Sequence, residues 1–301
     1  NSYHLNPEYI SSNFAAGLPS PTKQEASYST KLFDFLGPPR LNGEAIETRH
    51  KNIAASVHEF LERAVIALVN YHTKELGLRN LCLAGGVALN CSMNGKIRKL
   101  SSVDNLFVSP VSSDAGTSLG AAIYSYINSS NESKISKLED YYLGPEYSGA
   151  YIARLLDKLS IKYENDTNAE QYIASKLATG KIIALFNGRM EYGPRALGNR
   201  SILARPDNVQ LKEFINAEIK NREWFRPLAP VVLEENFSEI FEADGNSPYM
   251  TETFPVRNEW RKHLCGVMNA DYTSRPQTVN PLQNNFLYHI IREFYRITDI
   301  P

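Results

Sequence analysis

Apolar residues recur along this chain with a helical period in some stretches and as brief continuous runs in others. The longest periodic stretch steps by three and four residues from Ile46 onward and predicts an amphipathic helix that ends near Gly77. Short apolar runs predict buried strands. Further helices are expected at residues 90–96, 117–127, 151–159, 169–177 and 209–219, and strands at 81–84, 106–108, 181–186, 229–233 and 249–256.

The polar stretch at residues 128–134 (NSSNESK) shows no period and is typical of a linker. We therefore predict two domains, at residues 1–135 and 136–301. The first holds two strands that alternate with helices, and helix 117–127 has enough small residues to pack closely on the second strand, which predicts an α/β layer. The second domain is expected to be α+β or mixed α/β. Residues before about 42 mix Pro, Ser and aromatics and predict a surface loop with short helical turns.

Composition narrows the class of protein. The chain has 32 Lys and Arg against 33 Asp and Glu, so it lacks the bulk basic character expected for nucleic-acid binding. Cys82, Cys91 and Cys265 lack metal-ligand spacing, which favours a reducing, cytoplasmic setting. We find no uninterrupted apolar stretch of roughly 20 residues and no basic-then-apolar leader, and we therefore expect no association with a membrane.

Two polar motifs follow the first two expected strands. Gly85 and Gly86 come directly after the first, where a backbone can approach a ribose or phosphate closely, with Asn90 either capping the next helix or touching the ligand. A plain tight turn is the alternative. Asp114 follows the second strand and precedes a helix, so its carboxylate can face a hydrated metal or serve as an N-cap.

Four arginines crowd into residues 187–206 (NGRMEYGPRALGNRSILARP), with Glu191 as the one acidic residue among them. Guanidinium groups fit phosphate or carboxylate oxygens, and Gly and Pro can fix a tight path along which backbone N–H groups converge on an anion. We therefore predict an anion site here, able to neutralise a phosphoryl leaving group. The alternative is a solvated loop whose arginines form surface ion pairs, which stabilise a protein by about 0 to 1 kcal/mol each.

Four blocks in order carry a family resemblance: residues 83–91 (LAGGVALNC), 114–116 (DAG), 188–203 (GRMEYGPRALGNRSIL) and 225–230 (FRPLAP). Together they resemble the NodU/CmcH-type O-carbamoyltransferases, over nearly the whole chain. The resemblance implies a fold of the α/β and α+β classes. Residues 1–135 would be the second half of an actin-like (ribonuclease H-like) ATPase domain, and residues 136–301 an incomplete YrdC-like α/β domain.

The resemblance also implies a reaction. In this family, the YrdC-like domain is thought to convert carbamoyl phosphate and ATP into carbamoyl-adenylate. The actin-like domain then passes the carbamoyl group to a hydroxyl of a small molecule, such as a sugar, nodulation factor or antibiotic precursor, at a divalent metal. By this resemblance, carbamoyl phosphate and the nucleotide phosphates would be held by Arg189, Arg195, Arg200 and Ser201, with a further anion contact from Arg226. The adenylate would be held by Gly85, Gly86 and Asn90, and Asp114 would be a metal ligand.

The chain also departs from the family pattern. The N-terminal half-lobe with its paired metal-binding histidines has no counterpart before Asn1, and the chain ends at Pro301 before a segment rich in Asn, Ser and Phe. We therefore expect an interior piece that is inactive as a transferase by itself. A non-catalytic nucleotide- or anion-binding module and a related tRNA- or protein-maturation carbamoyl enzyme are the alternatives. The acceptor, the metal (iron, magnesium, manganese or zinc) and the oligomeric state, with a homodimer as one option, are left open.

Overall fold

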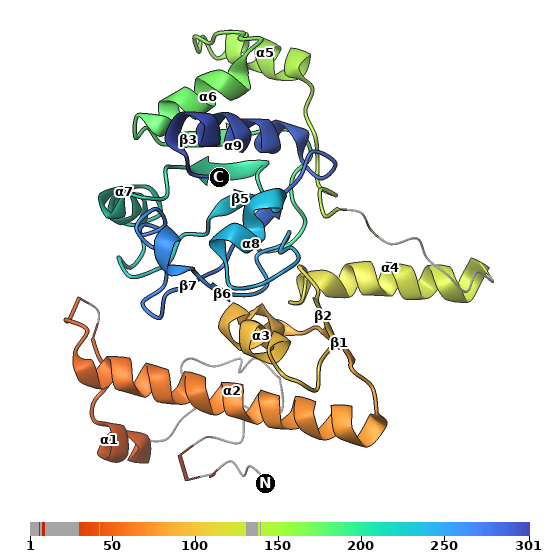
Figure 1. Cartoon of the computed structure of the whole chain (residues 1–301), viewed down its shortest axis with the longest axis vertical. Coiled ribbons are helices and arrows are strands. Elements are labelled where there is room, and N and C mark those ends of the chain that lie inside the picture. Colours follow the sequence, from red (N-terminus) through yellow and green to blue (C-terminus); the bar gives the residue numbers. More distant parts are fainter. Residues whose placement is uncertain (1–5, 7, 10–29, 42, 131–137, 139) are drawn as a thin grey trace. The chain divides into compact units, whose positions relative to one another are not determined.

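The structure is a computed structural model that describes residues 6, 8–9, 30–41, 43–130, 138 and 140–301. The chain is mixed α/β and divides into two compact units, Asn1–Leu78 and Arg79–Pro301 (Figure 1). The boundary predicted between residues 135 and 136 falls in a stretch outside the described residues, within the second unit. The α-helices are α1 Lys31–Leu36, α2 Thr48–Leu76, α3 Cys91–Arg98, α4 Ala115–Ser130, α5 Gly149–Lys158, α6 Ala169–Ala178, α7 Val209–Phe214, α8 Phe237–Ile240 and α9 Asn285–Thr298. The strands are β1 Asn80–Leu83, β2 Asn105–Val108, β3 Ile183–Phe186, β4 Arg200–Leu203, β5 Val231–Leu233, β6 Phe254–Pro255, β7 Thr273–Ser274 and β8 Gln277–Val279.

In the first unit, α2 confirms the long helix predicted from the apolar period. Glu47 and His50 form a capping box at its start, and Gly77 adopts the left-handed conformation that ends it. The guanidinium of Arg49 donates to the carbonyls of Leu36 and Pro38, which ties the start of α2 to the end of α1. Most of the N-terminal stretch predicted as a loop lies outside the described residues.

In the second unit, β1 and β2 pair in parallel with Leu81 opposite Leu106. A 3₁₀ turn at Gly86–Leu89 and helix α3 connect them, as parallel strands require a crossover. Met93 and Ile97 of α3 are buried. Because the strands are parallel, the residues that follow β1 and β2, including the glycine turn and Asp114, lie at the same edge of the pair.

Two sequence predictions for this segment are wrong. The first two strands were expected to be buried, but the two strands pair only with each other, and Cys82 and its partner Phe107 are exposed on one face. A short apolar run does not reveal how many faces of a strand are covered. Helix 117–127 was expected to pack closely on the second strand, but α4 buries no residue and extends to Ser130, through the first part of the predicted linker.

The C-terminal part of the second unit is built around short two-stranded sheets. β3 pairs antiparallel with β4, and β5 pairs in parallel with β8. Alternate residues of β5 enter two different cores: Val232 packs with Phe237 and Phe254, whereas Leu233 packs with residues of α6 and α9 such as Leu177 and Leu287. Helices α6 and α9 lie side by side over this second core (Figure 1). The apolar period of two along β5 therefore places the β5–β8 pair between two hydrophobic layers.

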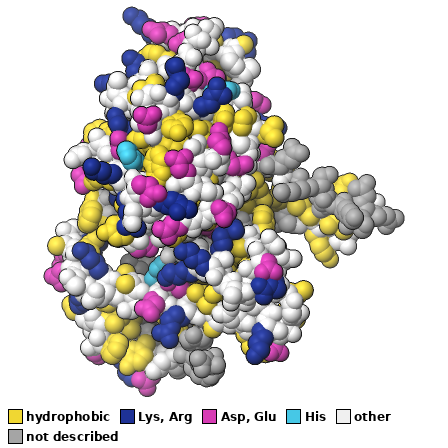
Figure 2. All heavy atoms as spheres, in the orientation of Figure 1, with side chains coloured by type: hydrophobic (Ala, Val, Ile, Leu, Met, Phe, Trp, Pro, Cys, Tyr) yellow, Lys and Arg dark blue, Asp and Glu magenta, His cyan; other side chains and the backbone are white. Residues whose placement is uncertain are grey.

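Most predicted helices and strands are present within a few residues of their expected positions. Strands β4, β7 and β8 were not predicted, and the strand expected at residues 249–256 is reduced to the two residues of β6. Helix 209–219 ends in a π-helical turn, Ile215–Ile219. On the face shown in Figure 2, basic and acidic side chains are interspersed. Among the described residues, no helix combines the length and the apolar character needed to cross a membrane.

Candidate anion-binding site

The glycine turn after β1 is open on its outer side. A Cβ atom added to Gly85 or Gly86 would meet nothing within 4 Å, so a ligand could approach this backbone closely. Asn90 caps α3, because its side-chain oxygen accepts a hydrogen bond from the backbone N–H of Met93 at 3.1 Å. Of the two roles expected for Asn90, the structure shows helix capping. The glycine turn before it is accessible to a ligand.

The turn that carries Asp114 contacts the arginine-rich run. The Tyr192 hydroxyl contacts the carbonyl of Ala115 and lies 2.8 Å from the Ser118 hydroxyl. At Gly193, where φ is +121°, an added Cβ would lie 3.0 Å from the carbonyl oxygen of Pro110, so the two backbones are packed closely. Asp114 is exposed and immediately precedes α4. The structure thus brings the second polar motif and the arginine-rich run together.

The backbone amides of the arginine-rich run converge on its own carboxylate. Oε1 of Glu191 accepts N–H groups from Leu197 at 2.8 Å, Asn199 at 2.8 Å and Arg200 at 3.1 Å. Glu191 is 7% exposed. The sequence suggested amides that point at a ligand, but these three are occupied by the carboxylate of Glu191 and cannot bind one.

The four arginines of the run point to different places. Arg189 is exposed and donates to the carbonyls of Gly144 and Leu143. Arg200 donates to backbone carbonyls of Asn187, Gly188 and Asn199, and its guanidinium carbon lies 3.6 Å from the centre of the Phe186 ring. Arg205 forms a bidentate ion pair with Asp207. Among the described residues, Arg195 alone of the four has neither a hydrogen bond nor an ion pair.

Ser201 and Gly198 shape the wall next to Arg195. The Ser201 hydroxyl accepts the N–H of Gly198 at 3.0 Å. Gly198 has φ +108°, and an added Cβ would lie 2.3 Å from Cδ2 of Leu287 on α9. Only glycine therefore fits here, both for its backbone conformation and for the close approach of α9. This glycine serves packing, and through packing it places Ser201.

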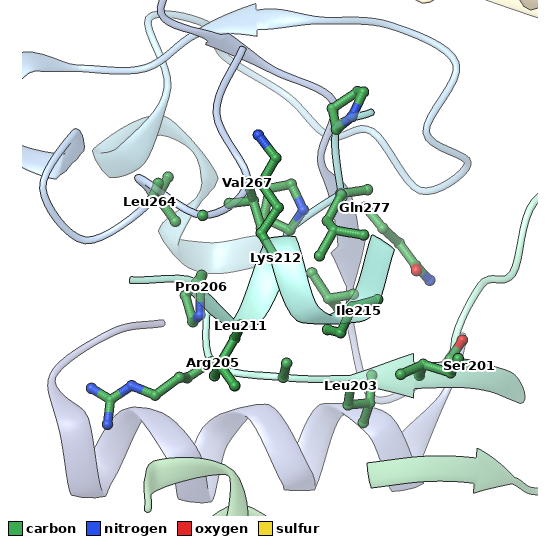
Figure 3. Close-up of a pocket in the computed structure, with 18 of the residues that line it drawn as sticks. Ser201, Leu203, Arg205, Pro206, Leu211, Lys212, Ile215, Leu264, Val267 and Gln277 are labelled. Atoms are coloured by element: carbon green, nitrogen blue, oxygen red, sulfur yellow. The ribbon is translucent and has the colours of Figure 1, made fainter. Parts of the chain in front are cut away.

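A cavity of about 270 Å³ lies between β4, α7 and the segments around β5 and β8 (Figure 3). Of the predicted site residues, Arg195 and Ser201 line it, whereas Arg189 and Arg200 do not. Arg205 also lines it, but its side chain points away from Ser201 and Gln277 in Figure 3. No Asp or Glu side chain of the described residues is part of the lining. The basic residues that line it are Arg195, Arg205, Lys212, Lys220, Arg222 and Arg275.

Three of these cations influence one another. Burial lowers the pKa of the Arg195 guanidinium, and the positive charge of Arg275 lowers it further. The pKa of Arg222 is likewise lowered, first by burial and then by the charges of Arg226 and Arg275. Arginine stays protonated even so, because its ordinary pKa lies above 12. Unlike Arg205, Arg195 and Arg275 have no ion-pair partner in the described part of the chain, so an anion between them would relieve their repulsion.

The two halves of the predicted site approach one another at α3. Cys91, the first residue of α3, acts on the pKa of Arg195 in the direction opposite to Arg275, so Arg195 lies within electrostatic range of the helix that follows the glycine turn. Arg226 is different, because it is exposed and forms an ion pair with Glu223 at 2.6 Å. The structure therefore places Arg195 and Ser201 at the cavity and Arg226 at an exposed surface turn.

Sequence reasoning missed several residues of the cavity. Arg275 and Gln277 lie in the unpredicted stretch around β8, and Lys212 lies on the helix α7. None of them has a glycine beside it or belongs to a cluster of arginines that would mark a site. Arg222 belongs to a charged cluster with Glu223 and Arg226 that did stand out, but only Arg226 was given a role.

Comparisons with known proteins identify the relatives of the chain. Residues 21–123 match the family described as carbamoyltransferase N-terminus, and residues 174–301 match the one described as carbamoyltransferase C-terminus. Nodulation protein NolO of Bradyrhizobium diazoefficiens is 38% identical over 87% of this chain and 49% of its own length. Nodulation protein U of Rhizobium tropici is 33% identical over 83% of this chain and 42% of its own length. An uncharacterized protein of Synechocystis is 36% identical over 99% of this chain and 52% of its own length. The chain spans about half the length of these relatives.

Proposed function

Because the chain belongs to the carbamoyltransferase family, we propose that its basic cavity binds carbamoyl phosphate as the carbamoyl donor. The observation that carries the proposal is a cavity with six basic residues in its lining, of which Arg205 alone has an ion-pair partner, and with no acidic one among the described residues. Carbamoyl phosphate is a small dianion, and arginine forks bind phosphate oxygens with charge-assisted, often bidentate hydrogen bonds. Burial and the positive charge of Arg275 lower the pKa of Arg195, so an anion between these two would relieve their repulsion.

In the proposed reaction, hydrolysis of the donor releases phosphate and leaves carbamate, whose oxygen attacks the α-phosphate of ATP to give carbamoyl-adenylate and pyrophosphate. The carbamoyl group then passes to a hydroxyl of a small molecule, and AMP leaves. Neutralising the phosphate is the part of this reaction that the described residues support. Arg195 and Arg275 would offset charge on the phosphoryl group, and Ser201 at the cavity wall could donate its hydroxyl hydrogen to a phosphate oxygen. The use of a small-molecule hydroxyl as acceptor is part of this proposal. So is the assignment of the two parts of the chain to an actin-like and a YrdC-like domain.

The residues present do not fit a metal centre. Across the described residues, no group of three or more His, Cys, Asp or Glu side chains is gathered where it could hold a metal ion. Asp114 is exposed and contributes a single carboxylate, whereas divalent ions take several oxygen or nitrogen ligands. We therefore derive no step through a metal, and we assign Asp114 no further role in the proposed chemistry.

The proposal is tested by titrating the chain with carbamoyl phosphate and with inorganic phosphate in a calorimeter. We expect both anions to bind to the wild-type chain. Loss of a charge-assisted hydrogen bond should weaken binding about 10- to 100-fold in Arg195→Ala and in Arg275→Ala. Arg296→Ala is the matched control, because Arg296 lies on α9 outside the cavity, is 73% exposed and pairs with Glu293. Its affinity should equal that of the wild type.

Three results would contradict the proposal. One is a wild-type chain that binds neither anion. Another is equal loss of affinity in Arg195→Ala and Arg296→Ala, which would reflect net charge and no specific site. The third is a loss of affinity in Arg189→Ala as large as that in Arg195→Ala, together with unchanged affinity in Arg275→Ala. This result would place the anion at the residues of the family resemblance and outside this cavity.

A further inference from the structure

The cavity is lined by a buried amide whose oxygen has no hydrogen-bond partner. Gln277, the first residue of β8, is 3% exposed and lines the cavity (Figure 3). Within the described part of the chain, its Oε1 is one of two buried side-chain atoms without a partner. A buried acceptor left unpaired destabilises the folded state, so such an atom on a residue that lines a cavity needs an explanation.

The orientation of this amide is fixed by its other end. Nε2 of Gln277 donates to the carbonyl oxygen of Leu197 at 2.8 Å. A carbonyl oxygen can only accept, so the nitrogen must face Leu197 and the oxygen must point away from it. Exchanging the two atoms would bring two acceptors together and would leave Oε1 no better satisfied.

The surroundings of Gln277 belong to the basic cavity. Arg275, which also lines the cavity, precedes it by two residues in the segment between β7 and β8. Leu197, which holds its nitrogen, is next in sequence to Gly198, which donates to Ser201. The amide of Gln277 is thus held, through its nitrogen, by the same turn that carries Arg195, two residues before Leu197.

The cations of the cavity can bind the phosphate of a ligand, whereas the unpaired Oε1 of Gln277 can accept a hydrogen bond from an N–H donor. Carbamoyl phosphate carries both groups on one small molecule. Resting on the function proposed above, we propose that Gln277 Oε1 accepts a hydrogen bond from the amino group of carbamoyl phosphate. Gln277 thereby selects this donor over acyl phosphates of the same charge that lack an amino group. Acetyl phosphate, with a methyl group in place of the amino group, leaves Oε1 unpaired.

The experiment compares the dissociation constants of carbamoyl phosphate, acetyl phosphate and inorganic phosphate by calorimetry on the full chain. We expect the wild type to prefer carbamoyl phosphate over acetyl phosphate by about tenfold or more, because a site built to pair an N–H group rejects an analogue without one. Gln277→Met keeps the length of the side chain and removes the acceptor. In that variant the preference should fall to about twofold or less, while inorganic phosphate binds as in the wild type.

Tyr142 provides the matched control. Its hydroxyl also donates to the carbonyl of Leu197 at 2.8 Å, so this carbonyl keeps a partner in Gln277→Met, and Tyr142→Phe removes the other donor while leaving Gln277 in place. Tyr142→Phe should retain the preference for carbamoyl phosphate. Gln277→Asn, which withdraws the acceptor by one methylene, serves in place of Gln277→Met if that variant does not fold.

Each outcome decides between explanations. Equal binding of carbamoyl and acetyl phosphate by the wild type overturns the inference but leaves the anion site intact. This result is expected if a water in the neighbouring cavity of about 10 Å³ pairs with Oε1 of Gln277. A preference that persists in Gln277→Met also overturns it. Absence of binding by all three anions is the failure of the proposed function itself.

Discussion

Replacing Glu191 by Ala tests how the arginine-rich run is held together. Oε1 of Glu191 accepts three backbone N–H groups, from Leu197, Asn199 and Arg200. Leu197 and Asn199 are buried, so water cannot easily replace the carboxylate at these two donors, whereas Arg200 is only partly buried. The substitution should therefore leave two amides without a partner and a third with water as its substitute.

The magnitude follows from the cost of each unpaired donor. A buried N–H group without a partner costs about 1 to 3 kcal/mol, so we expect Glu191→Ala to lower the free energy of unfolding by about 3 to 5 kcal/mol. Glu191→Gln keeps a carbonyl oxygen in the position of Oε1 and loses only the charge. Because hydrogen bonds to a charged group are roughly twice as strong as neutral ones, this variant should lose about 1 to 2 kcal/mol.

Urea unfolding measures both values. The two tryptophans of the chain, Trp224 and Trp260, both lie in the unit that contains Glu191, so their fluorescence reports its unfolding. Glu164→Ala is the control, because Glu164 is exposed and should change the free energy of unfolding by about 0.5 kcal/mol or less. If Glu191→Ala unfolds at the same urea concentration as Glu164→Ala, the carboxylate does not organise the run and the reasoning is refuted.

Two further substitutions test the packing around the cavity. Gly198→Ala should lower the free energy of unfolding by about 2 to 4 kcal/mol, measured by urea unfolding, because its Cβ would overlap Leu287 and φ is +108°. Burial raises the pKa of Tyr142 to about 12, so its neutral form stabilises the fold fully below the unfolded pKa of about 10, and that stabilisation is lost as pH rises toward 12. Between pH 9.5 and 11.5, the wild type should therefore lose about 1.5 to 2 kcal/mol more than Tyr142→Phe, measured by urea unfolding at both pH values.

Each of these two predictions has its own control and contrary result. Gly149 begins α5 with open space around its Cβ position, so Gly149→Ala should be neutral or slightly stabilising. A Gly198→Ala variant as stable as Gly149→Ala would show that α9 does not approach the arginine-rich run as described. For Tyr142, an alkaline loss of the same size in Tyr142→Phe and in the wild type would show that other groups cause it.

Helices and strands were largely predictable from the sequence because their apolar periods are local. The long helix α2 and the glycine that ends it follow from three- and four-residue spacing and from the left-handed conformation that Gly77 adopts. The depth of burial was not predictable in this way. β1 was expected to be buried, yet its Cys82 is exposed, because burial depends on which distant segments cover a strand.

The candidate site was predictable in position but not in composition. Residues 187–206 stood out because arginine, glycine and proline are concentrated there. A charge pattern does not show whether a guanidinium will meet a ligand or a backbone carbonyl, and Arg200 donates to three such carbonyls. Arg275 and Gln277 could not be found from the sequence, because their place beside Arg195 arises only when β8 pairs with β5.

The arrangement assigns different tasks to backbone and side chains. Because Glu191 occupies three amides of the run, the loop spends its backbone donors on its own shape, and it holds Arg195, which has no partner of its own, at the cavity. Under the proposed function, selectivity would come from side chains of a separate segment, Arg275 and Gln277. Grafting residues 187–206 alone onto another scaffold should therefore transfer the shape of the loop without its affinity for a phosphate.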